Sequence, residues 1–227
     1  MTGISDGIGK ATLLRLLSQG HYVYGNVRKD SDRERLLDKL GAQHAQRLNV
    51  HVCDLSRKSE IRSWLYRTLK SVPIDILINN AAVTSTKPFD KVSIREWEHV
   101  MRTNVTASFI TAQWAFKKMK KGGKGGAIIQ ISSLASVPYL EKFSGLVPYT
   151  ASKYAVAGMS ENIAVEGGPY GIQSVCISPG AVDTKMLQGI GRDFPTVLQP
   201  EQVAEWICEM VNHFNPMFNG MNMIVRP

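Results

Sequence analysis

The segment Tyr149-Thr150-Ala151-Ser152-Lys153 places a phenol and an ammonium four residues apart, at the start of a predicted helix. On a helix this spacing puts both side chains on one face, one turn apart. A phenol with a reference pKa of about 10 is a poor base at neutral pH, but a neighbouring ammonium lowers its pKa. The pair therefore suits proton transfer to or from an oxygen atom, although a lone pair of this kind is more often a helix-surface pair.

A glycine-rich segment, Thr2-Gly3-Ile4-Ser5-Asp6-Gly7-Ile8-Gly9, precedes an amphipathic stretch. Glycines here allow a tight turn, close approach of a pyrophosphate, and close packing of the following helix. The free N–H groups and positive dipole end of that helix would face the phosphates. The spacing differs from the common G-x-G-x-x-G, so the motif alone also fits an ordinary loop-to-helix turn.

Two further polar segments follow predicted strands. Asn79-Asn80-Ala81-Ala82 comes after the strand at 74–78, and Ser132-Ser133 comes after the strand at 127–131. Ligands of open α/β sheets bind at the carboxyl ends of the strands. Both segments are therefore candidates for ligand contact, while an Asn-initiated turn and an ordinary loop serine are the alternatives.

The elements that must position these residues alternate between short apolar runs and longer amphipathic stretches. Ser31 and Glu34 form a predicted capping box. This alternation predicts one α/β domain over 1–227, a doubly wound (Rossmann) parallel sheet with helices on both faces. Strands are predicted at 22–27, 48–53, 74–78, 127–131, 173–177 and 221–225, and helices at 8–19, 32–40, 57–69, 94–121 (with a bend), 149–166 and 200–214.

The first strand of such a sheet is missing from this pattern. A nucleotide-binding sheet begins with a strand that leads into the glycine loop, whereas Met1 already lies in the loop. That strand would be central, so its neighbours would present unpaired N–H and C=O groups. We therefore expect the native protein to carry a short segment before Met1.

Composition narrows the class of protein. The 227 residues are 44% hydrophobic and 20% charged, with a net charge of +8, which excludes a disordered or fibrous chain. No apolar run of about 18 residues is present, and nothing resembles a secretion signal, so we expect no membrane partner. Three scattered cysteines, Cys53, Cys176 and Cys208, indicate free thiols in a reducing, cytoplasmic setting. The five histidines do not cluster, so no metal site is expected, and no G-x-S-x-G motif indicates a hydrolase.

The densest positive charge lies at 117–124, where five lysines surround Met119, Gly122 and Gly123. Cations and glycines are typical of a helix C-terminus. A nucleic-acid surface is the alternative, but no aromatic residue interleaves with the lysines as a stacking platform requires. We expect a helix end and no nucleic-acid partner.

Taken together and in this order, T-G-x-x-x-G-x-G, N-N-A, the strand-end serine, Y-x-x-x-K and Pro179-Gly180 resemble the single-domain branch of the short-chain dehydrogenase/reductase family. The motifs extend over nearly the whole chain. The resemblance implies that Tyr149 is the catalytic acid/base and that Lys153 binds the nicotinamide ribose and lowers the pKa of Tyr149. It also implies that Ser133, rather than Ser132, bonds the substrate oxygen, and that Asn104 supports a proton-relay water.

The same resemblance implies a dinucleotide site. Asn80 and Ala81 would lie along the ribose, Asp54-Leu55 would meet the adenine, and Pro179, Gly180 and Thr184 would hold the carboxamide. Ala82 stands where the family usually has Gly, and we expect little effect from it. The full implied set of cofactor contacts is Thr2, Gly3, Ser5, Gly7, Ile8, Gly9, Arg28, Lys29, Asp54, Leu55, Asn80, Ala81, Ala82, Lys153, Pro179, Gly180, Val182 and Thr184.

The positive charge that follows the predicted strand 22–27 favours NADP(H) over NAD(H). An acid there would bind the 2′-hydroxyl of NAD, whereas an arginine accommodates the 2′-phosphate of NADP. This chain has Val27 in that slot, followed by Arg28 and Lys29. Asp30 and Asp6 argue in the other direction, so NAD remains the alternative.

We therefore expect an NADP(H)-dependent oxidoreductase that interconverts an alcohol and a carbonyl compound. A non-catalytic dinucleotide sensor or scaffold on the same fold is the alternative.

Apolar residues Met186, Leu187, Ile190 and Phe194 indicate a small to medium, largely apolar substrate. The long loop 134–148, with Tyr139, Leu140, Phe143 and Leu146, either lines that pocket or packs on the surface. Relatives pair helices corresponding to 94–121 and 149–166, which implies a homodimer or homotetramer, with Phe109, Trp114 and Met159 at that interface or in the core.

Overall fold

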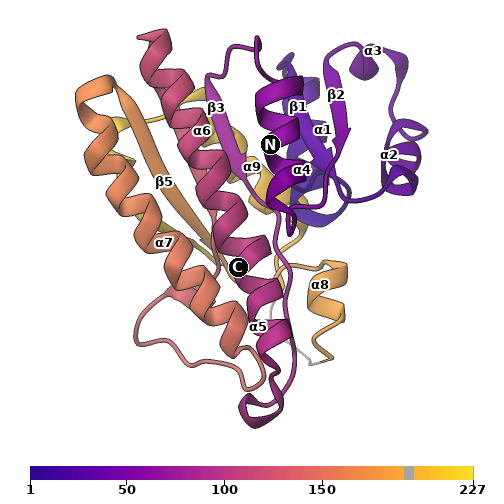
Figure 1. Cartoon of the computed structure of the whole chain (residues 1–227), viewed down its shortest axis with the longest axis vertical. Helices are drawn as coiled ribbons and strands as arrows, with labels where there is room; N and C mark the ends of the chain where they lie inside the picture. The colour runs from indigo at the N-terminus through magenta and orange to yellow at the C-terminus, as the bar shows by residue number, and fades with distance from the viewer. Residues whose placement is uncertain (192–196, 227) are drawn as a thin grey trace.

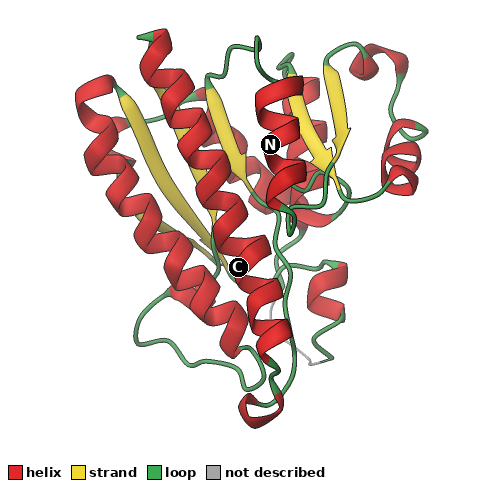
Figure 2. Ribbon diagram, in the orientation of Figure 1, coloured by secondary structure: helices red, strands yellow, loops and turns green. Residues whose placement is uncertain are grey.

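The computed structural model describes residues 1–191 and 197–226. Parallel strands form a middle layer with helices on both sides (Figures 1 and 2). The strands are β1 Val23–Val27, β2 Leu48–Val52, β3 Ile76–Asn79, β4 Gly126–Ile131, β5 Ile172–Pro179 and β6 Asn222–Val225. The α-helices are α1 Gly7–Ser18, α2 Asp30–Leu37, α3 Ala42–Ala45, α4 Lys58–Ser63, α5 Ile94–Met101, α6 Ala107–Gly122, α7 Val147–Gly167, α8 Lys185–Gln188 and α9 Pro200–Asn212.

The strands form two parallel sheets, ordered β1-β2 and β3-β4-β5-β6. Residues 1–4 run between them and bond to both sides. The Thr2 N–H donates to the Ile78 oxygen (2.9 Å), and the Ile4 N–H donates to the Asn26 oxygen (3.1 Å). The class of fold is as predicted, but these few residues are too short to join the sheets into one continuous ladder.

The gap between the sheets stays open beyond Met1. A cavity of about 460 Å³ lies there, between β1 and β3. Its walls include the side chains of Trp64 and Trp114 and the strand residues Tyr24 and Ile76. The terminal ammonium of Met1 donates to the Tyr24 oxygen over 2.7 Å. A cavity therefore separates part of β1 from β3 beyond the bonds made by residues 1–4.

The strands carry apolar residues on both faces, because helices cover both. Ile129 and Val175 face the cluster made with α1 and α9, while Ile128 and Ile172 face the cluster made with α4 and α6. Figure 1 shows α6 and α7 in front of the sheet and α9 behind it. Near-continuous apolar strands are what a sheet buried on both faces requires.

Three local predictions need correction. The α2 helix begins at Asp30 with Lys29 as N-cap, and Ser31 lies inside it, so the predicted capping box is wrong. The predicted helix 57–69 is α4 followed by a π-helical turn over Trp64–Thr68. The bend in the predicted helix 94–121 is a second π-helical turn, Arg102–Thr106, which separates α5 from α6.

The lysine-rich segment is a helix end, as predicted. The α6 helix stops at Gly123, whose φ of 68° is the left-handed conformation typical of a C-terminal glycine. Lys118 Nζ donates to the Lys70 oxygen (2.7 Å), and Lys120 Nζ donates to the Tyr170 hydroxyl (2.8 Å). These local contacts occupy two of its ammonium groups.

The structure also bears on the predictions for the cysteines and for the aromatic residues of α6. All three cysteines are free and buried. Trp114 is a core residue, while Phe109 on α6 is half exposed. Within the described ranges no helix is long and apolar enough to cross a membrane, and no cluster of metal-ligating side chains is present.

Candidate active site

Tyr149 and Lys153 lie one above the other in the first turns of α7. Lys153 Nζ is 5.4 Å from the centroid of the Tyr149 ring. The Lys153 side chain is 3% exposed and donates to the main-chain oxygen of Ile131, at the end of β4, over 2.8 Å. Burial lowers the pKa of Lys153 to about 8, because a low-dielectric site disfavours the charged form.

The pKa of Tyr149 moves in the direction opposite to the sequence prediction. Burial raises it, and a hydrogen bond with the Ser133 side chain opposes that rise in part. The Lys153 ammonium donates instead to the Ile131 carbonyl, and burial is the main cause of the raised pKa of Tyr149. In the described structure Tyr149 is therefore a protonated phenol at neutral pH.

The two strand-end serines differ in their contacts. Ser132 is buried, and its hydroxyl oxygen lies 2.9 Å from the Ser136 hydroxyl and 3.0 Å from the main-chain oxygen of Lys153, so either can accept its single proton. Ser133 accepts a bond from the Ala135 N–H (3.2 Å) and lies against the Tyr149 phenol. Ser132 therefore has a structural place, while Ser133 is the serine beside the phenol.

Asn104 lies in the π-helical turn between α5 and α6 and is buried. Its Oδ1 accepts from the Val83 N–H (2.8 Å), and its Nδ2 donates to the Val83 oxygen (2.9 Å). The same Nδ2 also lies 2.9 Å from the Ser152 hydroxyl oxygen. Asn104 thus joins the segment after β3 to α7, next to Lys153.

The glycine loop packs closely against the segment after β3. Gly3 and Gly7 have φ angles of 67° and 52°. A Cβ at Gly9 would lie 2.0 Å from the Gly3 oxygen and 2.5 Å from Asn80 Nδ2. The Asn80 amide donates to that Gly3 oxygen over 2.9 Å, and the buried Thr2 hydroxyl accepts from the Asn80 N–H (3.0 Å). The backbone is therefore open to a ligand at the N-terminus of α1.

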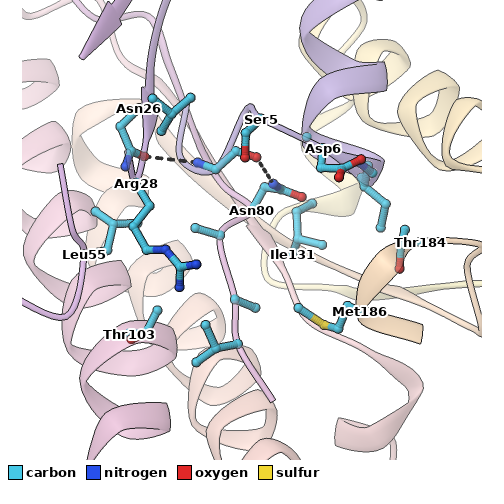
Figure 3. A pocket seen from close by; sticks show the side chains of 18 of the residues that line it. Ser5, Asp6, Asn26, Arg28, Leu55, Asn80, Thr103, Ile131, Thr184 and Met186 are labelled. Carbon is cyan, nitrogen blue, oxygen red and sulfur yellow. Dashed lines mark hydrogen bonds between the residues drawn. The ribbon is translucent and has the colours of Figure 1, made fainter. Parts of the chain in front are cut away.

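A first cavity of about 440 Å³ extends from this loop to Tyr149 (Figure 3). Among the predicted cofactor residues it is lined by Gly3, Ser5, Gly7, Ile8, Gly9, Arg28, Asp54, Leu55, Asn80, Ala81, Ala82, Lys153 and Thr184. Sequence reasoning missed Asn26, Asp32, His99, Thr103 and Lys185, which also line it. Asn26 could have been found, because it is a polar residue next to the carboxyl end of an apolar strand. Its Oδ1 accepts from the Gly3 N–H (3.0 Å).

The charged residues around this cavity are arranged unevenly. Figure 3 shows the Arg28 side chain on one side and Asp6 with Thr184 on the other. Lys29 lines neither this cavity nor the next and instead caps α2. Partial burial would raise the pKa of Asp54, but hydrogen bonds from Ser56 and the charge of Arg28 contribute to a net lowering.

Asp6 is held by two contacts. Its Oδ1 accepts from the Gly7 N–H (2.9 Å), which caps α1, and its other carboxylate oxygen pairs with the Lys185 ammonium of α8. Partial burial opposes ionisation, but the bonds from Lys185 and Gly7 lower the pKa of Asp6 overall. The pair fastens α8 to the glycine loop.

A second cavity of about 400 Å³ adjoins the first. Ser133, Pro179, Gly180 and Val182 line this cavity and not the first. Leu140, Phe143 and Leu146 also line it, which decides between the two interpretations of their loop, whereas Tyr139 is fully exposed. Met186, Leu187 and Ile190 complete its apolar wall, while Phe194 lies outside the described residues.

The two cavities meet at shared residues: Ile8, Ser132, Tyr149, Thr184 and Met186. A glycine-lined cavity at a helix N-terminus, joined through a tyrosine to an apolar cavity, defines a dinucleotide-binding α/β protein. A family model for short chain dehydrogenases matches residues 1–194. The chain therefore belongs to the short-chain dehydrogenase family, oxidoreductases that act on CH–OH groups with NAD(P).

Individual relatives differ in substrate and cofactor. The chain is 33% identical over 196 residues to 2-dehydro-3-deoxy-D-gluconate 5-dehydrogenase of Bacillus subtilis, covering 85% of this chain and 74% of that protein. It is 30% identical over 237 residues to an NAD-dependent glycerol dehydrogenase of Listeria innocua, covering 99% and 90%. A short-chain dehydrogenase from Sphingobium yanoikuyae, solved with NADPH, has the same fold, with a TM-score of 0.85 at 23% identity over 100% of this chain and 86% of that one.

Proposed function

We propose that this chain reduces a carbonyl compound to an alcohol with NADPH. The observation that carries the proposal is the position of Tyr149, which lines both the glycine-walled cavity and the apolar cavity. A cofactor in the first cavity and a substrate in the second would meet beside this phenol.

The residues of the first cavity fit a dinucleotide. The glycines let the loop pack closely against the segment after β3, because a Cβ at Gly3 or Gly9 would collide with neighbouring atoms of the chain. The N-terminus of α1 offers N–H groups to phosphate oxygens. Asn80 and Ala81 would lie along the ribose, and Lys153 would hold ribose hydroxyls. When bound, the dinucleotide supplies the hydride.

Tyr149 acts as the acid in this proposal. Its raised pKa keeps the phenol protonated at neutral pH, which is the form that donates a proton to a carbonyl oxygen. Ser133, next to the phenol, would donate a hydrogen bond to the same oxygen. Asn104 fixes the segment after β3 against α7, and we propose that it orders the path that returns a proton to Tyr149.

Arg28 is the basis for NADP(H) over NAD(H). It lines the first cavity and follows β1, at the place where a 2′-phosphate would be recognised. The Sphingobium neighbour was solved with NADPH, whereas the Listeria relative is NAD-dependent. Asp6 lies on the other side of the cavity and is paired with Lys185, so its carboxylate does not oppose a 2′-phosphate at Arg28.

The test is oxidation of NADPH in the presence of a panel of aldehydes and ketones. We expect turnover with apolar carbonyl compounds and a loss of roughly 10²–10⁴-fold in kcat for Tyr149→Phe, with NADPH binding retained. Equal activity of Tyr149→Phe and wild type would exclude the catalytic assignment. A chain that binds NADPH but reduces no carbonyl compound would instead be the sensor or scaffold.

We also propose that the chain forms a homodimer or homotetramer through α6 and α7. Phe109 on α6 is 50% exposed, and Tyr154 and Val165 on α7 are 40% and 77% exposed. Light scattering tests this: Phe109→Asp should shift the mass toward the monomer, whereas Phe89→Asp, at an exposed residue outside both helices, should not.

A further inference from the structure

The apolar cavity has a charged mouth that the proposed reaction does not use. Its lining includes Glu141, Lys142 and Arg226 beside the apolar side chains. Charged groups at the rim of an apolar pocket orient a ligand and provide specificity. Their availability for a ligand differs among the three.

Lys142 is already engaged by its own loop. Its ammonium donates to the Val137 oxygen over 2.5 Å and lies 5.5 Å from the centroid of the Tyr154 ring. These contacts hold the loop 134–148 in place. Lys142 therefore has a structural role at the wall of the cavity.

Arg226 directly follows β6, and it is exposed. It follows Val225, which is 6% exposed and whose oxygen accepts from the Gly180 N–H over 2.9 Å. Within residues 1–191 and 197–226, its guanidinium has no ion-pair partner closer than 4.0 Å. Arg226 is exposed, directly follows β6 and lines this cavity, so its guanidinium is available to a ligand there.

We infer that the substrate is an apolar carbonyl compound that carries a carboxylate at its far end, bound by Arg226. This inference rests on the proposed function. A guanidinium can bind a carboxylate in a bidentate manner, by donating two parallel hydrogen bonds. A cavity of about 150 Å³ already holds benzene, so about 400 Å³ accommodates a ring-sized body with a polar group at each end.

Glu141 is the counter-charge in this arrangement. It lines the same cavity and would repel a substrate carboxylate. The inference therefore makes a second, opposite expectation: removal of the Glu141 charge should strengthen binding of an anionic substrate, while removal of the Arg226 charge should weaken it.

The test compares 4-formylbenzoate with its methyl ester, since the two share the same aldehyde and ring. We expect wild type to prefer the carboxylate by about tenfold in kcat/KM, through KM, as one charge-assisted contact at a partly wet site would give. Arg226→Gln should bring the ratio near one and leave kcat for the ester unchanged. Arg226→Lys should fall between, and Glu141→Gln should raise the preference.

Arg62→Gln, on the exposed surface of α4, makes the same change in net charge and should keep the wild-type ratio. A wild-type ratio near one, or a ratio that survives Arg226→Gln, would overturn the inference while leaving carbonyl reduction intact. Failure of wild type to reduce either aldehyde would count against the proposed function instead. Calorimetry with terephthalate, which has no aldehyde to reduce, measures the contribution of Arg226 to binding without turnover. Equal affinity of wild type and Arg226→Gln for terephthalate would overturn the inference.

Discussion

The Nζ atom of Lys153 donates a hydrogen bond to the main-chain oxygen of Ile131 over 2.8 Å, and this bond ties α7 to the carboxyl end of β4. Because Tyr149 lies one turn before Lys153 on α7, the bond also fixes the position of Tyr149 between the two cavities. The ammonium is almost fully removed from water, so its place in the structure is costly in free energy. We expect function, rather than stability, to depend on it.

Replacement of Lys153 by methionine tests that expectation. The substitution removes a buried charge and keeps an unbranched apolar chain, so the free energy of unfolding should stay within about 1–2 kcal/mol of wild type or rise. NADPH reduction of an aldehyde should fall about 100-fold. Calorimetric unfolding and steady-state kinetics give the two values. Lys39→Met provides the control, because Lys39 is exposed and lines neither cavity. A variant with full activity would show that the ammonium is dispensable.

The pH dependence of stability provides a second test of Lys153. Its pKa falls from 10.5 to about 8 on folding, so between those values the unfolded chain binds more protons than the folded chain. Stability from this group therefore rises with pH from about 8 to 10.5, by on the order of 3 kcal/mol. Below pH 8 both states are protonated and the penalty is complete. The difference between wild type and Lys153→Met, measured by urea unfolding across pH 7–10.5, should follow this curve; a flat difference would contradict the lowered pKa.

Arg28→Gln should separate the two cofactors. The loss of a charge-assisted contact to a 2′-phosphate should weaken NADPH binding by about tenfold or more, while NADH binding changes little. Fluorescence titration with each dinucleotide measures this. Lys29→Gln is the matched control, because Lys29 lines neither cavity. Equal losses for NADPH and NADH would show that Arg28 does not contact the phosphate.

Gly9→Ala should disrupt the glycine loop. The new Cβ would come within 2.0 Å of the Gly3 oxygen and 2.5 Å of Asn80 Nδ2, so the bond between these groups must break or the loop must shift. We expect a loss of roughly 2–3 kcal/mol in stability and loss of NADPH binding. Gly158→Ala on α7 is the control: nothing lies within 4 Å of its Cβ position, so it should stabilise by about 0.5–1 kcal/mol. Thermal unfolding with and without NADPH measures the stability and the NADPH binding of both variants. A Gly9→Ala variant with wild-type stability and NADPH binding would contradict the packing described.

The divided sheet predicts uneven local stability. The free side of β1 is bonded only to residues 1–4, whereas β4 has a full strand on each side. Hydrogen exchange should therefore be faster for the amides of Tyr24 and Asn26 than for those of Ile129 and Gln130, because strands with fewer partners open more often. Equal protection of the two strands would show that the gap does not weaken the sheet.

The sequence determined the class of fold and the family. Runs such as 127–131 are apolar without interruption, and only a strand covered on both faces satisfies them. Tyr149 and Lys153 were predicted to share a helix face because four residues make about one turn, and the structure places them together. The glycine spacing likewise predicted a tight turn before a helix, and Gly3 and Gly7 have the positive φ angles that such a turn needs.

Tertiary structure decided the electrostatics and the pocket. The Tyr149 pKa depends on how much water the folded chain removes and on where the Lys153 ammonium points, and neither is encoded in a local spacing. The π-helical turn at Asn104 reflects packing of α5 and α6 against α7, which competes with ordinary helical bonding. Arg226 and Tyr149 are far apart in the chain and line one cavity because β6 ends, and α7 begins, at the same edge of the sheet. Such long-range proximity follows from topology, so the sequence alone could not assign a charge to the mouth of the substrate cavity.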